Sequence, residues 1–293
     1  MNYALEVTGL SKDYGRQNKK KDSEAFALKN VSFALPEGYI MGFVGPNGAG
    51  KTTTIKTILK LKKQDDGKVS LFGKTNSDIG VVMDSPCFPD EWTLARVEKA
   101  LSPFYGNWSH KKFSQYLVEF GLGVNKKVEE LSRGMKVKLL IAIALSHDAK
   151  LLVLDEPTSG LDPVSRDEIC ELLTEFIQDG SKSVLFSTHI TSDLEKIADY
   201  ITVILGGEIR FSGTKDELME KYQRVAGGIN DISESHREHL IGTRFHGTGF
   251  EGLAETTNAR KLPTSVLCEA ASLEEIIVFL NREFKSEGGN EHA

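Results

Sequence analysis

A segment near residue 50 carries the residue types and the spacing of a phosphate-binding loop. The pattern G-x-x-x-x-G-K-[S/T] is matched at every fixed position by Gly45, Pro46, Asn47, Gly48, Ala49, Gly50, Lys51 and Thr52, and Thr53 follows. Glycines let the backbone curl so that its N–H groups point at phosphate oxygens; Lys51 would neutralise the phosphates and Thr52 would bind Mg²⁺. The alternative is a glycine-rich turn with an incidental lysine. Because a strand pattern precedes the segment and a helical pattern follows it, we predict a nucleotide site.

Two adjacent carboxylates form a second candidate group. Asp155 and Glu156 directly follow the apolar run 151–154, which is typical of a buried strand. In α/β proteins ligands bind at the carboxyl ends of such strands. Asp155 is suited to hold Mg²⁺ through water, and Glu156 to act as general base on an attacking water. The alternative is that the pair merely caps a helix.

The elements that must position these groups alternate between strand and helix. Strand patterns cover 38–44, 79–83, 151–154, 183–187 and 201–205, and helical patterns cover 52–61, 164–177 and 191–197. This alternation predicts an α/β fold with a parallel sheet at its core. Further strand patterns at 5–7, 26–35 and 67–73 indicate antiparallel strands near the N-terminus. Helical patterns at 94–101, 112–120 and 135–146 indicate an inserted helical subdomain at about 85–148.

The last part of the chain gives weaker signals. A capping box begins at Thr214, and the composition changes near 225–228. A strand is predicted at 264–267, and a second capping box at Ser272 leads into a helix at 276–280. We therefore predict a main domain at 1–222 and a small α/β appendage at 223–293.

Composition limits the classes of function. The chain has 293 residues, a formal net charge of -6 and 40% hydrophobic residues, and no apolar run approaches the ~18 residues of a membrane span. The acidic balance argues against a nucleic-acid partner. The three cysteines are scattered and have no metal-ligand spacing, and the N-terminus does not resemble a signal peptide. These features predict a soluble, cytoplasmic protein.

Four further segments carry a family resemblance. Leu131-Ser132-Arg133-Gly134-Met135 resembles the LSGGQ signature of ATP-binding-cassette (ABC) ATPases. Residues 159–162 look like the D-loop of that family, His189 looks like its switch histidine, and Tyr14 lies where its adenine-stacking aromatic belongs. The resemblance covers roughly residues 3–222, with the motifs in the family's order. The runs 38–45 and 131–136 look most like ABC-2-type export subunits of Gram-positive bacteria.

The resemblance implies a P-loop ATPase that works as a head-to-tail dimer, with an identical chain or a paralogue, around two ATP molecules. Each ATP would be held by the phosphate loop of one subunit and by Ser132 and Gly134 of the other. His189 would contact the γ-phosphate and orient water beside Glu156. ATP hydrolysis would then power a separate polytopic membrane permease, an exporter of peptides, lipids or antimicrobial compounds, with this subunit peripheral on the inner face of the membrane. The appendage would be regulatory or dimerising.

The chain departs from the family pattern at two motifs. Asp84 stands where the glutamine of the Q-loop is expected; our hypothesis is that it keeps a metal-sensing role, since a carboxylate coordinates Mg²⁺ directly or through water. Arg133 and Met135 replace a glycine and the glutamine of the signature. Because Ser132 and Gly134 remain, we expect hydrolysis rather than binding alone.

Aromatic residues after Asp84 allow two interpretations. In this family a groove beside the helical subdomain receives a helix of the membrane subunit, and aromatic side chains favour such interfaces. We assign Phe88 and Trp92 to this groove and Phe104 and Trp108 to the core of the subdomain. The competing hypothesis for the whole chain is a soluble ABC ATPase of the translation or DNA-repair type.

Overall fold

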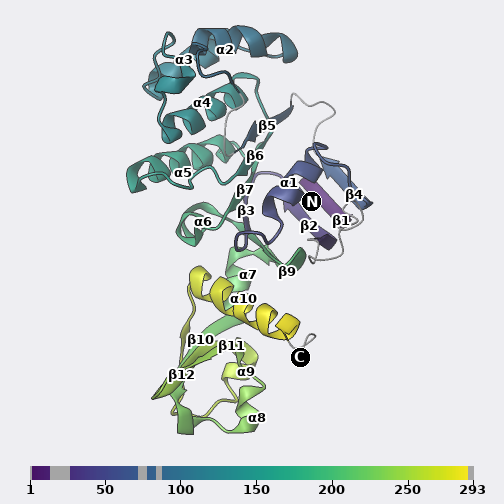
Figure 1. The fold of residues 1–293 in the computed structure, drawn as a ribbon, viewed down its shortest axis with the longest axis vertical. Coiled ribbons are helices and arrows are strands. Elements are labelled where there is room, and N and C mark those ends of the chain that lie inside the picture. The colour runs from purple at the N-terminus through teal and green to yellow at the C-terminus, as the bar shows by residue number, and fades with distance from the viewer. Residues whose placement is uncertain (1, 14–26, 72–77, 84–87, 290–293) are drawn as a thin grey trace.

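The computed structural model describes residues 2–13, 27–71, 78–83 and 88–289. Two predicted site residues, Tyr14 and Asp84, lie outside these ranges. Figure 1 shows, from top to bottom, a group of helices, a central sheet with its flanking helices, and a second sheet near the C-terminus.

The central sheet confirms the predicted α/β core. Its six strands run in the order β5-β6-β7-β3-β8-β9. Their bounds are β3 Ile40–Val44, β5 Ile79–Val82, β6 Leu151–Asp155, β7 Ser183–Thr188, β8 Tyr200–Leu205 and β9 Glu208–Thr214. All neighbours are parallel except β8 and β9, which form a hairpin. Every residue of β3, β6 and β7 is buried, as the apolar runs predict for strands covered on both faces.

Each face of the central sheet packs against a different layer. Alternate residues of a strand point to opposite faces, so Met41 and Phe43 join the core shared with the N-terminal sheet, and Ile40 and Val44 join the core shared with the helices. The N-terminal sheet is antiparallel, in the order β2-β1-β4. Its strands are β1 Tyr3–Asp13, β2 Ala27–Pro36 and β4 Asp66–Leu71. Helix α1 Lys51–Ile58 packs into the core shared with the N-terminal sheet, whereas α5 Pro163–Ile177 and α6 Thr191–Ile197 pack into the core on the other face.

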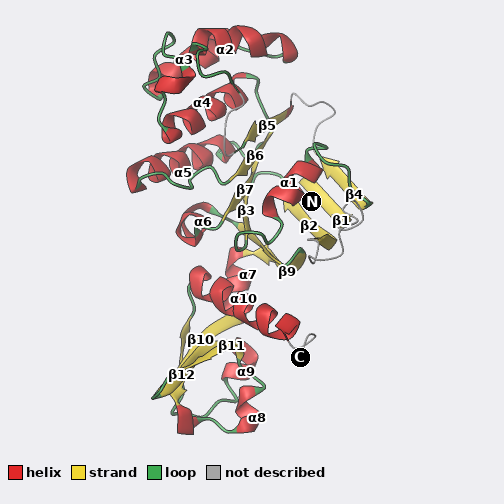
Figure 2. Ribbon diagram, in the orientation of Figure 1, coloured by secondary structure: helices red, strands yellow, loops and turns green. Residues whose placement is uncertain are grey.

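The inserted subdomain consists of helices and loops, which Figure 2 shows at the end of the molecule away from the C-terminal sheet. Its helices are α2 Leu94–Leu101, η2 Ser102–Phe104, α3 His110–Glu119, η3 Val128–Glu130 and α4 Arg133–Ser146. The placement of Phe104 in its core was wrong, because 81% of that residue is exposed. Trp108 does pack against the core, with its ring centroid 5.5 Å from that of the fully buried Phe113. Phe88 and Trp92 are partly buried against the same core.

The C-terminal region contains more strands than the sequence indicated. Its antiparallel sheet has the order β11-β12-β10-β13. The elements are α7 Lys215–Lys221, β10 Tyr222–Gly228, η4 Ile229–Asp231, α8 Glu234–Arg237, β11 Ile241–Phe245, β12 Gly249–Glu255, α9 Thr256–Ala259, β13 Leu267–Ala270 and α10 Leu273–Gly289. The strand predicted at 264–267 was misplaced, because Thr264 and Ser265 form a turn and the strand begins at Leu267. Glycines in β10, β11 and β12 weakened the strand pattern there.

Both capping boxes are present. The Thr214 hydroxyl accepts a hydrogen bond from the Glu217 N–H at 3.1 Å, and the Ser272 hydroxyl accepts one from the Glu275 N–H at 3.2 Å. The second box begins α10, which is longer than the predicted 276–280. Its residues Leu273 and Ile276 are fully buried in the same core as Leu194 of α6. Among the described residues, none of the helices combines the length and the apolar character needed to cross a membrane.

Candidate functional site

The phosphate-loop motif forms the turn between β3 and α1, as its sequence context predicts. Gly45 has no room for a side chain, because a Cβ there would lie 2.2 Å from the carbonyl oxygen of Ile204. Gly50 has φ 114°, in the region that favours glycine. The loop is also fixed from the β8–β9 hairpin, where the Gly207 N–H donates to the Ala49 carbonyl at 2.9 Å. Close backbone packing therefore requires the glycine at position 45, and the backbone conformation of the turn favours the glycine at position 50.

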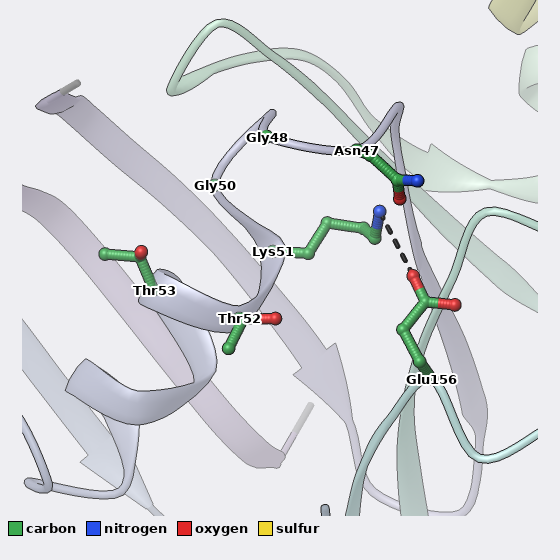
Figure 3. Close-up of a pocket in the computed structure, with 7 residues that line it drawn as sticks. All are labelled: Asn47, Gly48, Gly50, Lys51, Thr52, Thr53 and Glu156. Carbon is green, nitrogen blue, oxygen red and sulfur yellow. Dashed lines mark ion pairs between the residues drawn. The ribbon is translucent and has the colours of Figure 1, made fainter. Parts of the chain in front are cut away.

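Lys51 lies across the mouth of the loop. Its side chain is only 6% exposed, and its ammonium group donates to the carbonyl oxygens of Gly45 at 2.7 Å and Pro46 at 3.3 Å. The same ammonium forms an ion pair with Glu156 Oε1 at 3.2 Å. Figure 3 shows the Lys51 side chain extending from α1 toward Glu156, with Thr53 on the other side of the helix. A buried cation needs an anion beside it, and here that anion is Glu156.

Glu156 contacts His189 as well as Lys51. Its Oε2 lies 2.7 Å from Nδ1 of His189, whose side chain is 41% exposed. The backbone of Glu156 has φ 53°, a left-handed conformation that costs a non-glycine residue about 1–2 kcal/mol. Its N–H donates to the carbonyl of Ser187 at 2.9 Å, which holds this conformation. Such strain at a pocket is typical of a functional residue.

Asp155 is buried at the end of β6, with 3% exposure. Burial raises the pKa of its carboxyl, and hydrogen bonds from Thr52 and Ser187 offset part of that rise. The Ser187 hydroxyl donates to Asp155 Oδ1 at 3.1 Å. Because the Thr52 hydroxyl and the Asp155 carboxylate meet here, the site offers two hard oxygen ligands. This set fits Mg²⁺, which is typically bound by one or two carboxylates together with substrate phosphates.

A pocket of about 360 Å³ lies between the phosphate loop and Glu156 (Figure 3). It is lined by Asn47, Gly48, Gly50, Lys51, Thr52, Thr53 and Glu156. Ser132 and Gly134 do not line this pocket; they lie at the start of α4, where the Ser132 hydroxyl accepts a hydrogen bond from the Met135 N–H at 3.3 Å. The structure therefore brings the phosphate loop, Asp155, Glu156 and His189 together, and leaves Ser132 and Gly134 apart from them.

Comparisons with known proteins identify the family of this chain. The family described as "ABC transporter" matches residues 28–159. The bacitracin transport ATP-binding protein BcrA of Enterococcus faecalis is 34% identical over 85% of this chain and 82% of its own. The chain belongs to the ABC transporter ATP-binding family. The linearmycin resistance ATP-binding protein LnrL of Bacillus subtilis (strain 168) is 30% identical over 92% of this chain and 90% of its own.

Solved structures agree as well. The structure of an ATP-binding subunit of an ABC transporter has a TM-score of 0.63 and 28% sequence identity, covering 73% of this chain and 91% of that one. The chain is therefore an ABC transporter ATPase, in which ATP hydrolysis is coupled to transport.

In this ABC subunit the segment that resembles the signature contacts the segment that resembles the D-loop in the same chain. A Cβ on Gly160, which has φ 72°, would lie 3.1 Å from a guanidinium nitrogen of Arg133. A Cβ on Gly134 would lie 3.6 Å from Leu161 and from Ser165. The Arg133 guanidinium therefore lies directly beside Gly160.

Sequence reasoning gave no role to two contributors to this ABC site. The Ser187 hydroxyl donates a hydrogen bond to Asp155, and its position directly after the apolar run 184–186 and two residues before His189 was a usable signal. The Gly207 N–H supports the phosphate loop, and nothing local in the sequence connects residues 49 and 207.

We predict that Asp155→Asn stabilises the nucleotide-free protein. The raised pKa means that the folded state binds the Asp155 proton more tightly than the unfolded chain does. The ionised carboxylate therefore destabilises the fold above its folded-state pKa, and this effect fades as the pH falls through that value. Thermal unfolding between about pH 4 and pH 8 should show a higher melting temperature for the variant at neutral pH and no difference in acid. A lower melting temperature at neutral pH would contradict the prediction.

Proposed function

We propose that this chain hydrolyses ATP at an interface between two cassettes and thereby powers a separate polytopic permease that exports peptides, lipids or antimicrobial compounds. The observation that carries the proposal is the position of Glu156, whose two carboxylate oxygens contact Lys51 and His189 at the pocket. The Glu156 carboxylate thus contacts both Lys51, which is expected to bind the phosphates, and His189, which is expected to contact the γ-phosphate.

The contacts of Glu156 suggest how binding prepares the reaction. ATP phosphates replace Glu156 as the anion that Lys51 binds, since a phosphate carries more charge than the carboxylate it displaces. The oxygen released from Lys51 then accepts a proton from the attacking water as general base. His189 holds the other oxygen of Glu156 and contacts the γ-phosphate. Thr52 and Asp155 would hold Mg²⁺, which would neutralise charge on the phosphates, and in our hypothesis Asp84 senses the metal.

The second cassette completes the nucleotide site. Because Ser132 and Gly134 lie apart from the pocket of their own chain, they are free to contact the nucleotide bound to a partner. The partner is a second copy of this chain or a paralogue, arranged head to tail. Tyr14 would stack on the adenine. This arrangement gives each ATP a phosphate loop from one subunit and a signature from the other.

The names of relatives support the export proposal. One is a bacitracin transport protein, one confers linearmycin resistance, and a lantibiotic transport ATP-binding protein, SrtF of Streptococcus pyogenes, is 34% identical over 70% of this chain. All three names refer to antimicrobial compounds. In this proposal the permease contacts Phe88 and Trp92. That contact holds this subunit at the inner face of the membrane.

Replacing Glu156 by glutamine tests the role of the general base. Glu156→Gln is expected to lower the ATPase rate by ~10²–10⁴-fold, the range typical for loss of a general base. The affinity for ATP should be equal or tighter, because the variant removes the Glu156 carboxylate that competes with the ATP phosphates for Lys51. The rate is measured by phosphate release and the affinity with a fluorescent nucleotide. Glu175→Gln, an exposed glutamate on α5, is the matched control; a wild-type rate for Glu156→Gln would contradict the assignment.

Mixing two inactive variants tests the shared site. Lys51→Ala disables the phosphate loop, and Gly134→Asp places a negative charge in the signature with space for its Cβ. Each is expected to be inactive alone. A 1:1 mixture should recover up to about a quarter of the wild-type rate, since half of the dimers are mixed and each of these has one intact site. No recovery would contradict a site shared between two copies of this chain.

Affinity purification from detergent-solubilised membranes tests the partner. We expect a tagged copy of this chain to recover a polytopic membrane protein. Phe88→Ala and Trp92→Ala together should reduce that recovery, and Phe104→Ala, which alters an exposed aromatic elsewhere in the subdomain, should not. Recovery of ribosomes or DNA instead of a membrane protein would contradict the transporter proposal.

A further inference from the structure

The C-terminal helix α10 contacts two elements that lead directly into the nucleotide site. Its first turn packs on α6, which begins two residues after His189. Its later turns pack beneath the β8–β9 hairpin, which holds the phosphate loop. Figure 1 shows α10, in yellow, between the central sheet and the C-terminal sheet.

The contact with α6 includes a hydrogen bond to the helix terminus. The Leu273 N–H, which has no acceptor within its own helix, donates to Glu195 Oε1 at 2.8 Å. A carboxylate is favoured at this position because a helix N-terminus carries partial positive charge. The same contact is backed by apolar packing, since Leu273 and Leu194 are both fully buried in one core.

α6 is also tied to the helix that follows the D-loop. The Arg166 guanidinium donates to Asp193 Oδ1 from Nε at 3.1 Å and from Nη2 at 2.5 Å, and Asp193 is 7% exposed. Lys196 forms a second ion pair with Asp167. Both α5 and α10 thus contact α6, and the first residue of α6 follows His189 by two positions.

The contact with the hairpin is equally close. The Phe284 ring fills the place of a side chain on Gly206, where a Cβ would lie 2.1 Å from the ring. The Arg210 guanidinium lies over the same ring at 4.9 Å from its centroid. The next hairpin residue, Gly207, donates its N–H to Ala49 in the phosphate loop at 2.9 Å. Phe284 is therefore separated from the loop by only two residues.

We propose that α10 is a brace that sets the separation between His189 and the phosphate loop, with Glu195 and Phe284 as its positioning residues. Leu273 and Phe284 are eleven residues apart, so a rigid segment of about 16 Å joins the two contacts. Hydrolysis needs its groups placed to a fraction of an ångström, so a shift of this helix changes the rate. The inference rests on the proposed roles of His189 and the phosphate loop.

The brace also connects the site to the C-terminal sheet. The Gly242 N–H in β11 donates to Glu283 Oε2 at 2.5 Å, and Arg282 Nε donates to the Gly242 carbonyl at 3.1 Å. A Cβ on Gly242 would lie 2.0 Å from the carbonyl oxygen of Phe279, so strand and helix are in direct backbone contact. A displacement of the sheet therefore moves α10, which gives the C-terminal region a means of regulating hydrolysis.

Kinetics of single variants test the two contacts separately. Glu195→Ala should lower kcat about 3- to 10-fold at unchanged ATP affinity, because it disturbs the His189 side. Glu195→Gln, which keeps an acceptor oxygen for Leu273, should retain most of kcat. Phe284→Ala should instead raise the KM for ATP about 3- to 10-fold, because it loosens the hairpin behind the loop. Val278→Ala, at a partly exposed position on the same helix, is the control and should match wild type.

A double-mutant cycle tests the contact between Phe284 and Gly206 and leaves the residues of the phosphate loop unchanged. Gly206→Ala introduces a Cβ that collides with the ring, and Phe284→Ala removes that collision. The double variant should bind ATP more tightly than Gly206→Ala alone, since residues in contact give non-additive effects. Additive effects would overturn the contact as a positioning device.

Two controls separate failure of the brace from failure of the site. If Glu156→Gln leaves hydrolysis intact, the proposed site itself is wrong. If Glu156→Gln abolishes hydrolysis but Glu195→Ala and Phe284→Ala keep the kcat and KM of Val278→Ala, the brace is wrong. Lower melting temperatures with unchanged kinetics would also overturn it, because the contacts would then serve stability alone.

Discussion

A buried lysine is the constraint on which the rest of this structure depends. The Lys51 side chain is almost completely buried, and moving an unpaired charge out of water costs several kcal/mol. The fold must therefore supply an anion at this place, and without nucleotide it supplies Glu156. β3 and α1 place the cation, and β6 places the carboxylate. The central sheet brings the two together because β3, β7 and β6 are neighbours in it.

Two groups near Lys51 are held in arrangements that lower the stability of the fold. Glu156 adopts a left-handed backbone conformation, and Asp155 is buried deeply enough to raise its pKa. Both features destabilise the fold, and both persist because neighbouring contacts enforce them. Ser187 contributes to each, since its carbonyl binds the Glu156 N–H and its hydroxyl binds Asp155. A strand residue two positions before His189 thus supports both carboxylates.

The wider architecture determines how the site communicates. The signature residues Ser132 and Gly134 begin α4, apart from the pocket but next to the D-loop of the same chain. On the other side, α6 and the β8–β9 hairpin both rest on α10. We propose that the first contact links the site to a second cassette and that the second links it to the C-terminal region. The proposed catalytic groups would then lie between a contact with a second cassette and a contact with the C-terminal region.

The sequence by itself determined the core and the central part of the site. The phosphate loop and the Asp155-Glu156 pair are local patterns, and β3, β6 and β7 contain short apolar runs typical of strands buried on both faces, so short windows were enough to identify them. Tertiary structure alone decided that Phe104 is exposed, that glycine-rich segments form β10, β11 and β12, and that Phe284 packs under Gly206. These outcomes depend on contacts between residues far apart in the chain, and neither propensity nor periodicity encodes which distant surface a side chain will meet.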